Sequence, residues 1–160
     1  MFGRFFKTTI GILSVPIVIG TASAFVSFIS GISIYSGMLR LFERGVLFYF
    51  VLHIFVFRPV YLYVLGHEFV HVLATWVCGG KVVAFKVTPQ GGNVVTSKTN
   101  FFIELSPYFV PIYTLLIGPI FLILDAMGKQ PPFVGGVFIF LVGVTLAFHF
   151  AMTSEALRLQ

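Results

Sequence analysis

The sequence predicts an all-α integral membrane protein with about four transmembrane helices and one small β-hairpin between the second and third. Hydrophobic residues make up 58% of the 160 residues, and only 9% are charged. Soluble globular chains carry about 25% charged residues, and one aqueous core in a chain of this size cannot hide so much apolar surface. The apolar residues also gather in long stretches separated by short polar connections.

Two apolar stretches come before the most polar part of the chain. The first covers residues 8–38 and is longer than the apolar core of a signal peptide, which is about 7 to 15 residues. The second covers residues 45–78, which as one straight helix would reach about 51 Å, against a hydrocarbon core of about 30 Å. Pro59 lacks a backbone donor and disfavours helix at Arg58. We therefore expect the second helix to be kinked near Pro59.

The polar part, residues 79–100, predicts a hairpin at the membrane surface. Two valine-rich runs flank the turn-forming residues Pro89, Gly91 and Gly92. A third helix is expected over residues 101–127, kinked or partly unwound by its three prolines.

A fourth helix is expected over residues 133–156. Its small residues allow another helix to approach closely; they are Gly135, Gly136, Gly143 and Ala147. No repeat or linker divides the chain, so we expect residues 1–160 to form a single membrane domain.

The basic residues indicate a topology and exclude one class of partner. Six lie in the N-terminus, the hairpin and the C-terminus, and three in the opposite connections: Arg4, Lys7, Lys81, Lys86, Lys98 and Arg158 against Arg40, Arg44 and Lys129. The positive-inside rule then predicts a multi-pass protein of the cell (inner) membrane with both termini and the hairpin in the cytoplasm. The same residues are scattered rather than gathered in a patch, so we expect no nucleic-acid partner.

The sequence H-E-x-x-H at His67, Glu68 and His71 carries the clearest chemical signal. The i, i+4 spacing places both imidazoles on one helical face, where they can bind a single Zn²⁺ ion, and the adjacent glutamate can act as general base on water. Ionisable side chains inside a membrane helix are costly and therefore indicate a functional site. The alternative is a set of ordinary buried polar residues at helix contacts.

These residues resemble the site-2 protease family of intramembrane zinc metalloproteases. The resemblance rests on GHEFVH at 66–71, on the Gly-rich hairpin that follows, and less specifically on Gly118-Pro119, across roughly residues 60–150. It implies that His67 and His71 bind zinc, that Glu68 activates water, and that an aspartate in a later membrane helix completes the site. That aspartate usually lies in a Leu-Asp-Gly or Asn-Pro-Asp-Gly sequence, whereas this chain has Leu124-Asp125-Ala126.

The depth of each candidate in the membrane favours His149 as the third zinc ligand. His71 lies seven residues before the hairpin-side end of its helix, about 10 Å below that surface, and His149 lies seven residues before the end of its own helix near Ala156. Asp125 would be carried about 36 Å away, to the opposite face. Three histidines plus water form a known catalytic zinc set. The alternative for His149 is a histidine satisfied by a backbone or hydroxyl partner.

We expect a zinc-dependent endopeptidase that acts on a membrane protein or peptide within the lipid bilayer, with Glu68 as the catalytic base. Gly92 and Asn93 are expected to hold an unwound substrate segment as an added strand. Two other classes stay open: a membrane protein that binds or transports metal without proteolysis, and a catalytically silent membrane scaffold. Glu68 discriminates, because a carrier has no need of a carboxylate that does not bind the metal. The sequence does not indicate an oligomeric state.

Other polar residues are expected to play no part in the site. His53 lies about 21 Å from His67 along a straight helix and cannot share its metal. Glu155 is expected to be a solvated charge at a helix end, Glu104 a surface or capping residue, and Asn100 a turn residue.

Overall fold

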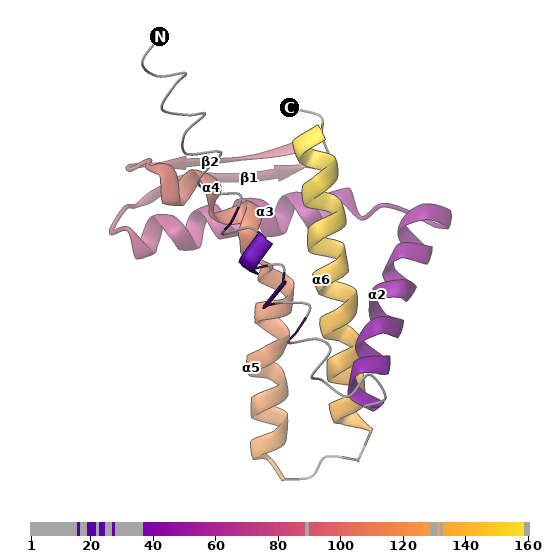
Figure 1. Ribbon diagram of the computed structural model, residues 1–160. Helices are drawn as coiled ribbons and strands as arrows, with labels where there is room; N and C mark the ends of the chain where they lie inside the picture. The colour runs from indigo at the N-terminus through magenta and orange to yellow at the C-terminus, as the bar shows by residue number, and fades with distance from the viewer. Residues whose placement is uncertain are drawn as a thin grey trace. The chain divides into compact units, whose positions relative to one another are not determined.

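The computed structural model describes residues 37–88, 90–128, 131 and 133–158, together with residues 16, 19–21, 23–24 and 27 (Figure 1). The chain divides into two compact units, Met1–Arg40 and Leu41–Gln160. In the first unit the described residues between 16 and 27 are helical, and the rest of the helix expected up to residue 36 lies outside the described residues. Gly37, one residue before the expected end of that helix at residue 38, is the first described residue of the next helix.

The helix expected over residues 45–78 is two separate helices, α2 at Gly37–Phe55 and α3 at Val60–Val77. The break falls at the expected place. Pro59 has no N–H to donate, and the carbonyl of Arg58 instead accepts the backbone N–H of Val60 at 2.8 Å. At its start α2 includes the charged residues Arg40, Glu43 and Arg44, which were expected to lie in a connection.

The predicted hairpin is confirmed. Strand β1, Val82–Thr88, pairs antiparallel with β2, Gly91–Thr96, with an irregularity between Val82 and Ala84. The turn needs glycine because Gly91 has φ +153°, and the Thr88 hydroxyl donates to the Gly91 carbonyl at 2.7 Å.

The helix expected over residues 101–127 is also divided. Helix α4, Phe101–Phe109, and helix α5, Ile112–Ala126, are bent by 70° relative to each other, and the break lies at Pro111. The Asn100 side chain caps α4 by accepting the backbone N–H of Ile103 at 2.8 Å. The last helix, α6, covers Val134–Arg158 and therefore ends two residues later than expected.

Helices α5 and α6 form an antiparallel pair. The rings of Phe121 and Phe138 stack with centroids 4.2 Å apart, and the hydroxyls of Thr114 and Thr145 lie 2.9 Å apart near the other end of the pair.

Helix α2 runs parallel to α6 and approaches it at two glycines. A Cβ atom on Gly45 would collide with the carbonyl of Phe140, and one on Gly143 would collide with the carbonyl of Phe42. The close packing expected of Gly143 is thus confirmed, and the two backbones touch because neither residue has a side chain. The buried core lies beside this crossing and consists of Tyr49, Ala147, Phe148 and Met152.

Helix α3 lies across the end of α5 and α6 rather than alongside them (Figure 1). The Tyr113 hydroxyl, at the start of α5, donates to the Leu62 carbonyl of α3 at 2.6 Å. Over its whole length α3 packs more on the hairpin and α4 than on α5 and α6. By length and composition, α3 and α6 could each span a membrane, and the bent pair α4–α5 makes a third candidate. The four expected spans are not found among the described residues.

Candidate functional site

The H-E-x-x-H sequence lies in the middle of α3, where neighbouring elements cover the helix. Gly66 sits against the side chains of Ile112 and Tyr113, so close that a Cβ atom would lie 2.7 Å from the Tyr113 ring. The rings of His67 and His71 are neighbours, with centroids 5.0 Å apart and planes at 79°. The i, i+4 spacing therefore brings the two imidazoles together as expected.

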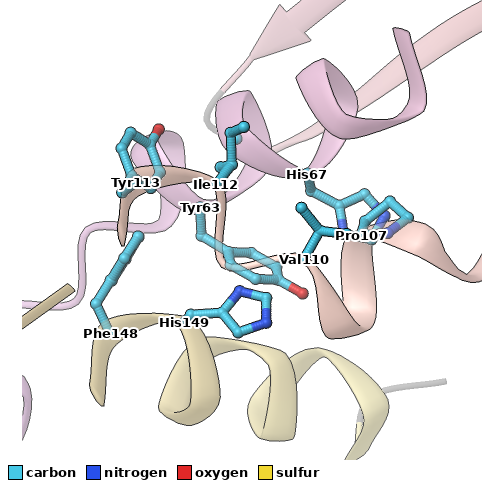
Figure 2. Close-up of a pocket in the computed structure, with 9 residues that line it drawn as sticks. Tyr63, His67, Pro107, Val110, Ile112, Tyr113, Phe148 and His149 are labelled. Atoms are coloured by element: carbon cyan, nitrogen blue, oxygen red, sulfur yellow. The ribbon is translucent and has the colours of Figure 1, made fainter. Parts of the chain in front are cut away.

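A hollow on the side of α3 that faces α5 and α6 is lined by His67 and His149. Its walls come from α3, α4, α5 and α6 and consist of Tyr63, Gly66, His67, Pro107, Val110, Ile112, Tyr113, Phe148 and His149. The Tyr63 ring extends from α3 towards α6 and lies beside the His149 ring, while His67 lies beside Pro107 (Figure 2). The structure thus places His149 next to the motif helix.

A second hollow lies on the hairpin side of α3 and is lined by Glu68 and His71. Most of its lining is polar, and the lining comes from α3, β2, α4 and the residues before α4: Glu68, His71, Gly92, Asn93, Val94, Thr96, Thr99, Ile103 and Glu104. Glu68 is only 9% exposed. Both hairpin residues singled out from the sequence, Gly92 and Asn93, therefore border the same space as the glutamate.

Gly92 allows the hairpin to rest directly on the catalytic candidate. A Cβ atom on Gly92 would overlap the side chain of Glu68 and would lie only 2.7 Å from the Oε1 atom of its carboxylate. Any other residue at position 92 would have to displace the hairpin or the carboxylate.

Two backbone carbonyls determine which ring nitrogen carries the proton in neutral His71 and His149. Nδ1 of His71 lies 2.8 Å from the Ile103 carbonyl, and Nε2 of His149 lies 3.3 Å from the Tyr108 carbonyl. A carbonyl can only accept, so in neutral rings these nitrogens carry the proton, and Nε2 of His71 and Nδ1 of His149 keep a free lone pair. Metal-binding histidines are held in this way.

The donor chemistry of the three histidines fits zinc. Nδ1 of His67 is buried and has no hydrogen-bond partner, which is costly for a neutral imidazole and natural for a metal ligand. Among the described residues, no three His, Cys, Asp or Glu side chains are arranged closely enough to hold an ion as they stand.

Asp125 lies away from both hollows. It is at the far end of α5, thirteen residues after Ile112, or about 20 Å along the helix. The bend between α4 and α5 leads α5 away from α3, so no fold-back returns Asp125 to the motif (Figure 1).

Several site residues escaped the sequence analysis. Glu104 lines the hairpin-side hollow and accepts the Thr99 hydroxyl at 2.7 Å, although it was expected at the surface with no part in the site. Tyr63 lies four residues before His67, and that helical spacing was a signal that it shares the face of the motif. No sequence signal pointed to Thr96 or Thr99.

Glu155 differs from the expected solvated charge. Its carboxylate lies 2.8 Å from the Arg58 guanidinium and 3.3 Å from Nε2 of His53, whose Nδ1 bonds the Tyr49 hydroxyl at 3.0 Å. These groups link α2, the break before α3, and α6. His53 thus belongs to a polar network of its own and does not line either hollow beside the motif.

Comparison with known proteins adds no relative: no protein-family model, curated protein or solved structure matches the chain.

Proposed function

We propose that the protein is a zinc-dependent endopeptidase of the site-2 protease type that hydrolyses a peptide bond of a membrane-associated substrate. The observation that carries the proposal is the hairpin-side hollow, where Glu68 and His71 share one polar space bordered by the exposed strand β2. This arrangement supports the proposal because the Glu68 carboxylate could accept a proton beside the proposed zinc ligand His71, next to a strand that could hold an extended peptide.

The metal would be held by His67, His71 and His149, which present lone pairs from α3 and α6. When bound, zinc supplies a Lewis acid and makes a coordinated water a stronger acid.

The remaining chemistry belongs to Glu68. Its carboxylate takes a proton from the attacking water and later delivers it to the leaving amine. Burial helps because the surrounding structure holds the side chain in one position, with Gly92 against it. The Glu68 carboxylate also supports proteolysis over metal transport, since a carrier needs no general base.

Strand β2 supports the binding of an unwound substrate. Among the described residues the sheet has two strands, so within this part of the chain one edge of β2 is not paired. Four residues of β2 border the hollow: Gly92, Asn93, Val94 and Thr96. A peptide added to that edge would pass Glu68 in extended form, with its carbonyls free of helical hydrogen bonds.

We further propose that the chain is a multi-pass protein of the cell (inner) membrane with both termini in the cytoplasm. The support is the apolar character of α6 and of the bent pair α4–α5, together with the distribution of basic residues.

Glu68→Gln tests the mechanism. In membranes of cells that produce the wild-type chain, labelling of new protein N-termini should reveal cleavage products that the Glu68→Gln chain does not generate. The purified variant should keep about one zinc per chain, because Glu68 does not bind the metal. Glu43→Gln makes the same chemical change at an exposed position on α2 and should leave cleavage intact.

His67→Ala should lose both zinc and cleavage. Products that persist in Glu68→Gln would refute the general base. Zinc bound by a wild-type chain that yields no products would instead support a metal-binding protein without proteolytic activity, and absence of zinc and products would support a scaffold.

A further inference from the structure

We propose that α3 and α4 lie flat in the interface between the headgroups and acyl chains of an anionic bilayer, at one end of the helices α2, α5 and α6, and that α3 does not cross the membrane. The surface concerned is the outer side of α3 and α4 together with the hairpin, and its partner is lipid.

The contacts of α3 indicate that it crosses α5 and α6 instead of running alongside them. Its first half touches the start of α5, where Leu62 meets Tyr113, and the later part of α6, where His67 and His149 share a hollow. In its second half, Nδ1 of His71 lies 2.8 Å from the Ile103 carbonyl of α4, and α3 as a whole packs more on α4 and the hairpin than on α5 and α6. From Ile112, α5 continues for about 20 Å away from α3 (Figure 1).

Both ends of α3 contact polar groups that lie at the same end of α2, α5 and α6. Before its first residue, Arg58 pairs with Glu155, which lies three residues before the end of α6. After its last residue, the Cys78 carbonyl accepts a hydrogen bond of 3.2 Å from the Lys98 ammonium group. A spanning helix separates its ends by about 30 Å along the membrane normal. Here the helix lies crosswise, and no such separation exists (Figure 1).

Helix α4 is also crosswise to α5, from which it is bent by 70°, and it packs on α3. Large apolar side chains are exposed on both crosswise helices; on α4 they include Phe101 at 77% and Phe109, and on α3 Trp76 at 56% and Val77. Aromatic residues of this kind favour the membrane interface, where short helices lie in the plane of the bilayer with apolar side chains in lipid.

The charge of the hairpin complements anionic headgroups. Residues 79–100 contain three lysines and no acidic residue, and Lys81, Lys86 and Lys98 are all exposed. Basic residues next to an apolar surface are attracted to anionic lipid. The exposed apolar surface also continues onto α5 at Leu115 and Leu116, as a lipid-facing surface would.

The position of α3 has a consequence for the substrate that rests on the proposed function. The hollow with Glu68 and His71 opens on the hairpin side of α3. The bond to be cleaved would then lie at headgroup level, in a segment next to a transmembrane helix rather than in its middle.

The side of the membrane reached by each end of α3 tests the placement. In the full-length chain with Cys78→Ala, single cysteines are introduced by Phe57→Cys before α3, Ser97→Cys after it, and Met127→Cys at the far end of α5. All three positions are exposed. In vesicles of one orientation, an impermeant thiol reagent should label positions 57 and 97 from the same side and position 127 from the other. Labelling of positions 57 and 97 from opposite sides would overturn the proposal.

Depth provides a second test that does not depend on activity. Trp76 is the only tryptophan of the chain, so its quenching by phosphatidylcholine brominated at different acyl positions reports one depth. The double variant Phe69→Trp, Trp76→Phe reports a second, seven residues earlier. In vesicles that also contain phosphatidylglycerol, the flat placement predicts the same quenching profile for both, whereas a spanning α3 predicts depths about 10 Å apart. Equal profiles with absent cleavage would leave the placement valid and count only against the proposed function.

Discussion

The crossing of α2 and α6 gives the sharpest stability prediction. In Gly143→Ala, the new Cβ atom would collide with the backbone carbonyl of Phe42, which cannot rotate away as a side-chain tip can. Overpacking of this kind costs about 1 to 3 kcal/mol. Gly135→Ala is the matched control in the same helix, because a Cβ atom there meets nothing within 4 Å. In the control, alanine should gain up to about 1 kcal/mol from its higher helix propensity.

The gain in helix propensity is common to both variants, because both glycines lie in a helix. The two variants should therefore differ by about 1 to 3 kcal/mol in free energy of unfolding, the cost of the overpacking. Reversible denaturation in detergent, followed by the helical circular dichroism signal, measures this difference. Equal stabilities, or a more stable Gly143→Ala chain, would show that α2 and α6 do not touch at these glycines.

Two further changes test the site and its support. Gly92→Ala should reduce cleavage at least tenfold, which corresponds to about 1.4 kcal/mol in the activation barrier. The zinc content should stay at the wild-type level, because the new methyl group meets the Glu68 carboxylate and leaves the histidines unchanged. Activity equal to wild type would mean that the hairpin does not rest on Glu68. Asn100→Ala should lower the free energy of unfolding by about 1 kcal/mol through loss of the α4 cap, and Asn100→Asp, which can still accept the Ile103 N–H, should recover most of the loss in the same denaturation assay.

Local sequence signals predicted the elements well. Pro59 and Pro111 mark both helix breaks, and Gly91 marks the hairpin turn. These effects act within a few residues, since proline removes a donor and glycine permits positive φ. Pro107 and Pro119 nevertheless lie inside helices, so a proline alone does not decide where a helix ends.

The direction of the helices escaped prediction because it depends on distant contacts. The depth argument took every apolar stretch as a membrane crossing and aligned α3 parallel to α6. Yet His149 lies beside His67 because α3 passes across α6 at that point. Arg58 and Glu155 are almost a hundred residues apart, and no local pattern indicated that they pair.

The parallel packing of α2 against α6 also determines the order in which the molecule can be assembled. Helices α5 and α6 are neighbours in sequence and can pair as soon as both are made, whereas the contact of Gly45 with α6 closes a loop of nearly a hundred residues. During synthesis α2 must therefore wait for the last described helix. The same helix brings His149 to the motif, so a chain that stops before α6 holds His67 and His71 without their third partner. If the protein acts as proposed, this order delays the assembly of the zinc site until α6 has been made.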